Sequence, residues 1–162
     1  MPDNDWHYAL DAEYVKVVRE IKTPVTLFSS RVSAEGRQIK TYAVWDTGAT
    51  HSALSPKIAQ ELGLRPIDAC IVRGINNNQI SDIVIASISL TSGLLLTGKR
   101  FTVNDIPGAD VLIGMDIIMM GDFVINNADG KTLFSFAIPP FKNKISYSEK
   151  ADSINERISK KR

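Results

Sequence analysis

Apolar and β-branched residues gather in two runs near the start of the chain, Val25–Phe28 and Ile39–Trp45. The segment between them, Ala34–Arg37, is polar and contains a glycine, which is typical of a turn. Runs of this length and composition on either side of a turn predict a β-hairpin. The second strand of this hairpin leads directly to Asp46.

A short helix is expected next. Ser55 can accept hydrogen bonds from free amides at a helix start, and Pro56 fits the first helical position because it needs no N–H there. Ile58 and Leu62 then lie on one face, and Gly63 is a natural end. The pattern predicts a short amphipathic helix between Ser55 and Gly63.

Strand signals dominate the middle of the chain. Three β-rich runs are present, at Ala69–Val72, Ile80–Leu90 and Phe101–Val103. The segments that separate them, Gly74–Gln79 and Thr91–Lys99, carry turn-forming residues and are predicted as loops. We therefore expect these strands to pair through hairpins.

The last predicted elements are a strand, a helix and a hairpin. Ala109–Gly114 reads as a buried strand that ends at glycine, and Met115–Met120 fits a short apolar helix. Asp122–Ile125 and Thr132–Ile138 then predict a final hairpin. The order strand, glycine, helix therefore occurs twice, once after Tyr42 and once after Val111.

The length of 162 residues favours a single compact domain. We assign this domain to residues 21–141. Residues 1–20 form an N-terminal extension whose apolar pattern fits either a strand or a short helix. Residues 142–162 are rich in charged and polar side chains and are expected to form a charged tail, flexible or weakly helical.

The composition of the chain excludes few classes of function. Hydrophobic residues make up 44% of the chain and the formal net charge is +1, so charge gives no reason to expect nucleic acid or a membrane as a partner. Cys70 is the only cysteine, which rules out an intrachain disulfide and favours a reducing compartment. The acidic, polar start lacks the features of a secretory signal, and we expect a soluble, cytoplasmic protein.

Asp46 is the strongest candidate for a catalytic residue. It opens the run Asp46-Thr47-Gly48-Ala49 directly after an apolar strand, so rigid backbone would hold its carboxylate while the glycine lets another chain approach. The alternative is a simple turn, because Asp, Thr and Gly all form turns.

The wider context favours the first interpretation. The run Asp46-Thr47-Gly48-Ala49-Thr50-His51-Ser52 resembles the active-site strand of retropepsin-like aspartic proteases, the group of retroviral, retrotransposon and related bacterial enzymes. Val111-Leu112-Ile113-Gly114-Met115-Asp116-Ile117 is similar to the second signature of that family, in which Ile113 and Gly114 have a structural role. The resemblance spans about residues 24–140 and joins two signatures, which makes it more specific than either one alone.

This resemblance implies a mostly β, single-lobe acid-protease barrel with two short helices, present as a homodimer. It also implies an active-site loop in which Thr47, Gly48 and Ala49 support Asp46 and the dimer. The flap that covers substrate would fall at five residues: Val72, Arg73, Gly74, Ile75 and Asn76.

The family chemistry needs two carboxyl groups, one to accept a proton from water and one to donate a proton to the substrate. One Asp-Thr-Gly is present, and no acid stands at the matching place beside Ile113 and Gly114. We therefore expect a homodimer with one active site, acting as an aspartic endopeptidase on peptide or protein substrates without cofactor or metal. The alternative is a dimeric peptide-binding or regulatory module with little or no hydrolysis.

Other candidate residues have simpler explanations. His51 lacks companions for a metal site and is expected to be structural or exposed. Cys70 is expected to be a buried small hydrophobe, and Ser52 to serve in turn or helix capping. Asp116 is interpreted as an acid that the helix dipole favours.

Overall fold

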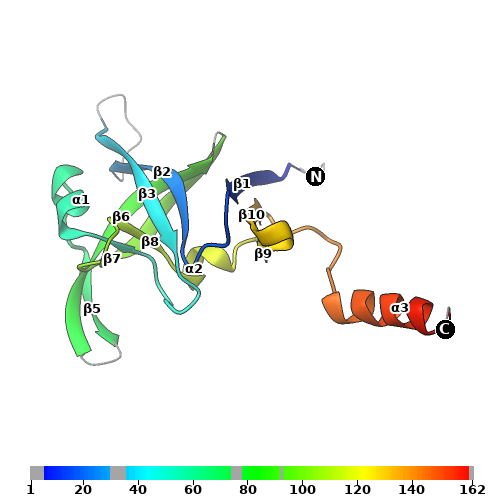
Figure 1. Ribbon diagram of the computed structural model, residues 1–162. Coiled ribbons are helices and arrows are strands. Elements are labelled where there is room, and N and C mark those ends of the chain that lie inside the picture. Colours follow the sequence, from blue (N-terminus) through cyan, green and yellow to red (C-terminus); the bar gives the residue numbers. More distant parts are fainter. Residues whose placement is uncertain (1–5, 30–35, 74–77, 92, 161–162) are drawn as a thin grey trace.

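We describe the protein from a computed structural model, for residues 6–29, 36–73, 78–91 and 93–160. The fold is mostly β, as predicted (Figure 1). The strands are β1 (Tyr8–Tyr14), β2 (Ile21–Ser29), β3 (Gln38–Trp45), β4 (Ala53–Leu54), β5 (Asp68–Arg73), β6 (Asn78–Thr91), β7 (Leu94–Val103), β8 (Val111–Ile113), β9 (Asp122–Asn126) and β10 (Thr132–Ile138). The helices are α1 (Pro56–Glu61), α2 (Met115–Ile118), the 3-10 turn η1 (Ala128–Gly130) and α3 (Tyr147–Ser159).

A seven-stranded sheet forms the body of the protein, in the order β2-β3-β8-β4-β7-β6-β5. Because β2 also pairs with β6 through residues 26–29, the sheet curls back on itself as a barrel. Its interior is filled by apolar side chains with almost no exposed surface, among them Leu27, Leu54, Ile88, Phe101 and Ile113. Burial of these side chains is the main force that holds the barrel together.

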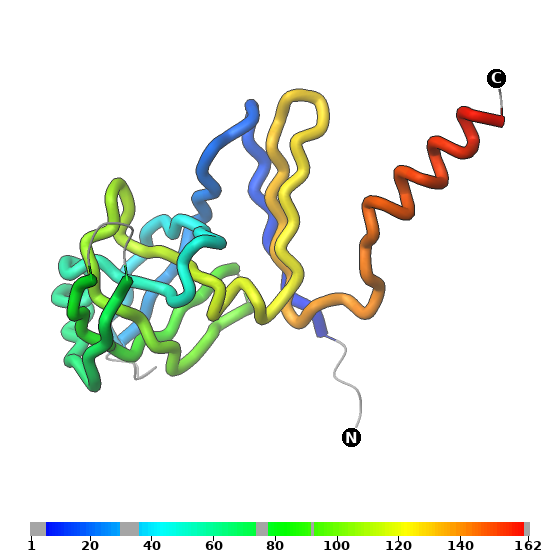
Figure 2. Tube along the Cα trace, turned by 90° about the horizontal axis from the view of Figure 1, so that it is seen from below, coloured from blue at the N-terminus to red at the C-terminus, as the bar shows by residue number. Residues whose placement is uncertain are grey.

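A separate three-stranded sheet, in the order β1-β10-β9, projects from the barrel (Figure 2). Its inner face is aromatic: the ring centroids of Phe123, Phe134 and Phe136 lie 5.9, 5.0 and 4.9 Å from that of Trp45 at the end of β3. The aromatic contact therefore joins the small sheet to the barrel at the residue that precedes Asp46.

The N-terminal extension contains a strand, which decides between the strand and the helix that its sequence allowed. Residues 8–14 form β1, which pairs antiparallel with β10 from Tyr8 opposite Ile138 to Tyr14 opposite Thr132. The division of the chain at residues 20 and 141 stays a prediction.

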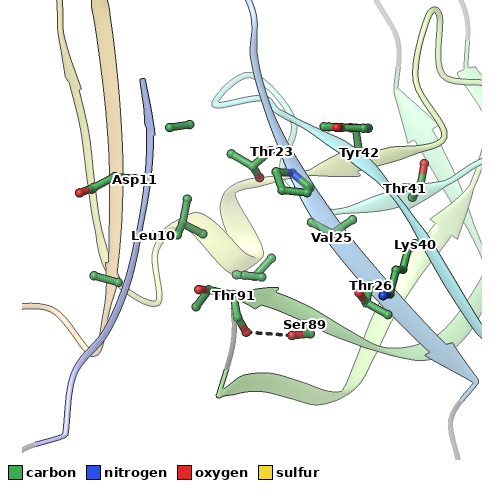
Figure 3. A pocket seen from close by; sticks show the side chains of 14 residues that line it. Leu10, Asp11, Thr23, Val25, Thr26, Lys40, Thr41, Tyr42, Ser89 and Thr91 are labelled. Atoms are coloured by element: carbon green, nitrogen blue, oxygen red, sulfur yellow. Dashed lines mark hydrogen bonds between the residues drawn. The ribbon is translucent and has the colours of Figure 1, made fainter. Parts of the chain in front are cut away.

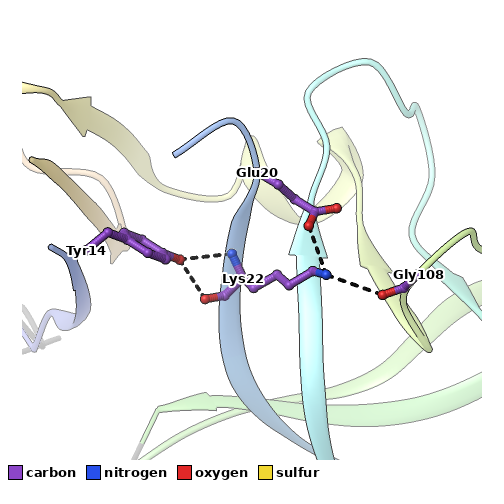
Figure 4. A network of polar contacts seen from close by, with 4 residues as sticks. All are labelled: Tyr14, Glu20, Lys22 and Gly108. Atoms are coloured by element: carbon purple, nitrogen blue, oxygen red, sulfur yellow. Dashed lines mark hydrogen bonds and ion pairs between the residues drawn. The ribbon is translucent and has the colours of Figure 1, made fainter. Parts of the chain in front are cut away.

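A polar network fixes the chain between β1 and β2 (Figure 4). The Tyr14 hydroxyl accepts from the Lys22 amide at 2.9 Å and donates to the Lys22 carbonyl at 2.7 Å. The Lys22 ammonium lies 2.8 Å from a Glu20 carboxylate oxygen and donates to the Gly108 carbonyl at 3.3 Å. These contacts hold residues 19–22 beside the loop that precedes β8.

The prediction of a loop at Thr91–Lys99 is wrong, because residues 94–99 belong to β7 and pair with β6, Ile88 opposite Leu96 and Ala86 opposite Lys99. Gly98 has a φ of 62° within this strand, and the register shifts between Ala86 and Ile88. A bulge lets a strand contain such a residue, so the pairing with β6 overrides the local turn signals.

The C-terminal segment is helical over 13 residues, with none of its side chains buried. Ser146 caps the N-terminus of α3, because its hydroxyl accepts from the Glu149 amide at 3.3 Å. The helix projects away from the rest of the molecule (Figures 1 and 2). The helical alternative for the tail is therefore the observed one. None of the helices in the described residues has the length and apolar character needed to cross a bilayer.

Candidate active site

Asp46 lies where two parallel strands end side by side. β3 and β8 are neighbours in the barrel, with Trp45 opposite Ile113, so Asp46 and Gly114 occupy equivalent positions one residue later. The Asp46 amide donates to the Ile113 carbonyl at 2.9 Å, which extends the ladder to the acid itself. The buried strands on either side therefore fix the backbone of Asp46.

The turn after Asp46 leaves its side chain partly exposed and restrains one carboxylate oxygen. The Gly48 amide donates to Asp46 Oδ1 at 2.8 Å, and the Ala49 amide donates to the Asp46 carbonyl at 3.3 Å. Asp46 is half-buried, whereas Thr47 and Gly48 are exposed. One carboxylate oxygen is thus oriented by backbone, and the tip of the turn is free to contact another molecule.

Gly114 allows the two signature segments to cross in contact. A Cβ at this position would lie 2.7 Å from both the carbonyl carbon and the oxygen of His51 and 2.9 Å from the Ala49 oxygen. The amide of Met115 donates to that same Ala49 oxygen at 2.8 Å. Backbone on both sides leaves no room for a side chain, so only glycine fits.

Ser52 and Asp116 form a polar link that the sequence interpretation missed. The amide and the hydroxyl of Ser52 both donate to Asp116 Oδ1, at 2.9 and 2.7 Å, and the Gly114 amide donates to Ser52 Oγ at 3.0 Å. Ser52 has no exposed surface. Its role is to connect the two signature segments rather than to cap a turn. In the sequence, only the repeated order of strand, glycine and helix related these two segments to each other.

A second link of this kind lies at the start of α1. Ser55 caps the helix as predicted, because its hydroxyl accepts from the Ile58 amide at 3.3 Å. That hydroxyl also donates to Asp110 Oδ1 at 2.9 Å, and the Ser55 amide donates to the Asp110 carbonyl at 2.8 Å. The chain that follows the active-site turn is thus tied to both ends of β8, by Ser52 at one end and by Ser55 at the other.

Two hollows adjoin the turn. One, of about 400 Å³, has Asp46 and Thr47 in its wall together with residues 19–21 and the side of β9 that carries Phe123 and Ile125. The other, of about 330 Å³, lies towards the hairpin of β5 and β6. Its apolar lining comprises Ala49, Ala53, Val72, Ile106, Pro107 and Leu112.

The predicted flap residues fall partly within the structure. Val72 and Arg73 end β5 and pair with Gln79 and Asn78 at the start of β6. Val72 is half-buried and lines the 330 Å³ hollow, whereas Arg73 is exposed. Gly74, Ile75 and Asn76 lie outside the described residues.

His51 and Cys70 meet at a smaller hollow of about 250 Å³, which Phe101 and Thr102 also line. His51 is exposed, in line with expectation. Cys70 is half-buried, so the prediction of a buried thiol is wrong. The reason is that β5 is the last strand of the sheet and has a neighbouring strand, β6, along one edge. Among the described residues, no three His, Cys, Asp or Glu side chains gather as metal ligands would.

A larger hollow, of about 730 Å³, separates β1 from the barrel strands β2 and β3 (Figure 3). Leu10 points into it from β1, and Thr23 and Val25 line it from β2 (Figure 3). It contains no residue of either signature segment.

Comparison with known proteins identifies the family. A protein-family model described as gag-polyprotein putative aspartyl protease matches residues 30–119, more than half of the chain and both signature segments. The chain belongs to this aspartyl protease family. The resemblance to retropepsin-like aspartic proteases is thereby confirmed, and the mostly β barrel agrees with the predicted fold class. The homodimer stays a prediction.

Two solved structures are similar to this aspartyl protease family member. One is a retropepsin-like aspartic protease from Rickettsia conorii, with 16% identity, a TM-score of 0.48 and coverage of 82% of this chain and 95% of that one. The other is the retroviral protease-like domain of Ddi1 from Leishmania major, with 18% identity, a TM-score of 0.49 and coverage of 73% and 95%. No curated protein matches the chain.

Proposed function

We propose that the protein is an aspartic endopeptidase whose active site is completed by a second copy of the chain. The observation that carries this proposal is that Asp46 and Gly114 occupy equivalent positions directly after two adjacent parallel strands. One strand end presents an acid held by backbone, while the equivalent strand end presents a glycine. A single chain therefore supplies half of a two-carboxylate site.

The proposed reaction needs both halves. One Asp46 carboxylate takes a proton from a water molecule while the water oxygen attacks the peptide carbonyl carbon. The protonated Asp46 of the partner gives its proton to the carbonyl oxygen. The tetrahedral diol then collapses. The first carboxyl gives its proton to the leaving nitrogen as the C–N bond breaks, and a diol hydroxyl returns a proton to the second carboxylate, which restores the pair. Two close carboxyls that share one proton provide both roles without a covalent intermediate or a cofactor.

A twofold axis beside Asp46 would supply the second carboxyl. Thr47 and Gly48 form the exposed tip of the turn, so two copies can approach there without displacing the core. A twofold interface uses the same surface on both subunits, which brings identical acids together. We propose that Thr47 contacts the partner across this axis and that Gly48 offers its backbone to substrate.

The hollow beside Ala49 is the proposed place for a substrate side chain. Two alanines widen this hollow, and Val72, Ile106 and Leu112 give it apolar walls. An extended peptide that runs between the turn and the β5–β6 hairpin would present alternate side chains to such a pocket. We therefore expect a preference for apolar residues near the cleaved bond, with residues 72–76 as the flap.

A peptide library treated with wild-type protein and with Asp46→Asn tests the proposal, with cleavage read by mass spectrometry. The matched control is Asp129→Asn, an exposed acid with a φ of 54° that asparagine also tolerates. We expect cleavage by wild type and by the control, and none by Asp46→Asn. If the folded wild type cleaves no peptide but still binds peptides, the protein is a binding module instead.

A further inference from the structure

The small sheet has an outer face that is open to solvent. Residues directly opposite one another in a sheet share a face. The pairings therefore place three rows on the face turned away from the aromatic cluster: Ala9, Ala137 and Asp122; Asp11, Ser135 and Val124; Glu13, Leu133 and Asn126. Asp11 and Glu13 are exposed, and Leu133 keeps 41% of its surface exposed. We call these nine residues the outer face.

The outer face is continuous with the surroundings of Asp46. A hollow of about 780 Å³ lies between it and the chain that leads into α3, with Val124 and Ser135 on one side and Phe141 and Tyr147 on the other. Phe123 and Ile125 line both this hollow and the one that contains Asp46. An interface that forms at Asp46 therefore extends naturally along β9 to the outer face.

α3 carries a narrow apolar stripe. Tyr147, Ala151, Ile154 and Ile158 follow spacings of four, three and four residues, which place them on one side of the helix. Tyr147, Ile154 and Ile158 are 61%, 47% and 52% exposed. A helix of 13 residues is only marginally stable alone in water, so a packing partner for this stripe would stabilise it.

The charges of α3 complement those of the outer face. Lys150 and Arg157 flank the stripe on one side, at positions where helical geometry turns them towards a bound surface. The acids of the helix, Glu149, Asp152 and Glu156, lie on the opposite side. The exposed acids of the outer face, Asp11 and Glu13, therefore meet a basic edge when the stripe packs against Leu133 and Val124.

The lengths also agree. Thirteen helical residues span about 20 Å and seven residues of strand span about 23 Å, so α3 can cover most of β10. A layer of helix on the open face of a sheet is a standard way to bury that face.

We propose that α3 of one copy packs across the outer face of a second copy, and that the exchange is reciprocal. This inference rests on the proposed function, because the second copy is the one that completes the Asp46 site. A second copy fits better than the chain's own sheet, because Phe141 is anchored by its amide to Asp122 Oδ2 at 2.8 Å and by stacking on His7, and α3 then leads away from its own body (Figure 2). The exchange adds two symmetric contacts to the dimer.

Two charge-reversed proteins test this, with mass measured by sedimentation equilibrium. One is Lys150→Glu with Arg157→Glu, which changes the helix; the other is Asp11→Lys with Glu13→Lys, which changes the outer face. We expect each alone to dimerise about tenfold or more weakly than wild type, because like charges then face each other. An equimolar mixture should restore the dimer, because both contacts in the mixed pair are complementary again.

The matched control is Glu149→Lys with Glu156→Lys, which changes charge on the far side of α3 and should leave dimerisation unchanged. The helix variant alters no buried side chain, so it tests the contact even if the outer-face variant fails to fold. Equal dimerisation of wild type and helix variant, or no recovery in a mixture of folded variants, would overturn the inference. Dimers that depend on α3 but cleave no peptide would refute the proposed activity alone, whereas Asp46-dependent cleavage that is insensitive to α3 would refute only the exchange.

Discussion

Gly114 shows how strongly one residue can constrain the active-site region. Gly114→Ala would place a Cβ 2.7 Å from His51 backbone atoms, which cannot move without disturbing the turn. We expect a loss of unfolding free energy of about 3 kcal/mol, the upper end of the range for overpacked sites. Urea denaturation measures it.

Gly98→Ala is the matched control for that substitution. Gly98 has open space around it and a φ of 62°, so alanine there meets only the dihedral penalty of about 1 kcal/mol. Equal losses of unfolding free energy in the two variants would show that the close approach of His51 backbone to Gly114 adds no cost of its own.

Ser52 is the residue whose hydroxyl joins the two signature segments. Ser52→Ala removes the hydrogen bond from the hydroxyl to Asp116, keeps the one from the amide, and leaves the Gly114 amide without its acceptor. We expect a loss of about 1–3 kcal/mol in unfolding free energy, and lower peptidase activity in the folded fraction. Thermal unfolding and cleavage assays check the two effects separately.

Ser87→Ala provides the comparison for Ser52. Ser87 is also buried, but its hydroxyl accepts one long bond, 3.4 Å from the Gly98 amide. Its loss should cost less than about 1 kcal/mol. A Ser87 variant as unstable as the Ser52 variant would mean that burial alone, and not the link to Asp116, explains the result.

At the scale of elements, Trp45 joins the barrel to the small sheet. It is 6% exposed, contacts three phenylalanines and donates from Nε1 to Thr23 Oγ1 at 2.9 Å. Trp45→Ala should cost about 3–5 kcal/mol. Trp6, the other tryptophan, is 70% exposed, and Trp6→Ala should change unfolding free energy by less than about 0.5 kcal/mol. Similar stability of the two variants would contradict the role of the aromatic cluster.

Elements defined by local signals were predictable from the sequence. The hairpin before Asp46 and the helix that begins at Ser55 follow from a period, a turn and a cap that lie within a few residues of one another. The strand at residues 94–99 was not predictable in this way, because Gly98 and the residues before it have the composition of a loop. Their strand structure depends on pairing with β6.

Long-range contacts account for the rest. Leu10, Ala12 and Tyr14 are half-buried and the residues between them are exposed, but the strand that pairs with β1 comes more than a hundred residues later, and no local pattern reveals it. Asp46 was predictable as a candidate because its tripeptide is continuous in sequence. The partnership of Ser52 with Asp116 was not, because it depends on two segments that meet only after folding.

For the whole molecule, a shared active site predicts a dominant effect of inactive subunits. An equimolar mixture of wild type with Asp46→Asn, after exchange of subunits, should show about half of the activity per wild-type chain, because mixed pairs lack one carboxylate. Activity per chain should also rise with protein concentration as dimers form. An activity per wild-type chain that changes neither with added Asp46→Asn nor with protein concentration would show that one chain is sufficient for cleavage.

The pairing of β1 with β10 has a consequence for how the protein is made. The first strand of the fold has its only described ladder partner in the last strand, so a chain leaving the ribosome cannot complete the small sheet until nearly all of it has emerged. The barrel strands can pair earlier, so Trp45 stays exposed until the phenylalanines of the small sheet pack against it. During synthesis the nascent chain is thus exposed to aggregation at the side that later adjoins Asp46, and a chaperone that shields this side would raise the yield of folded protein.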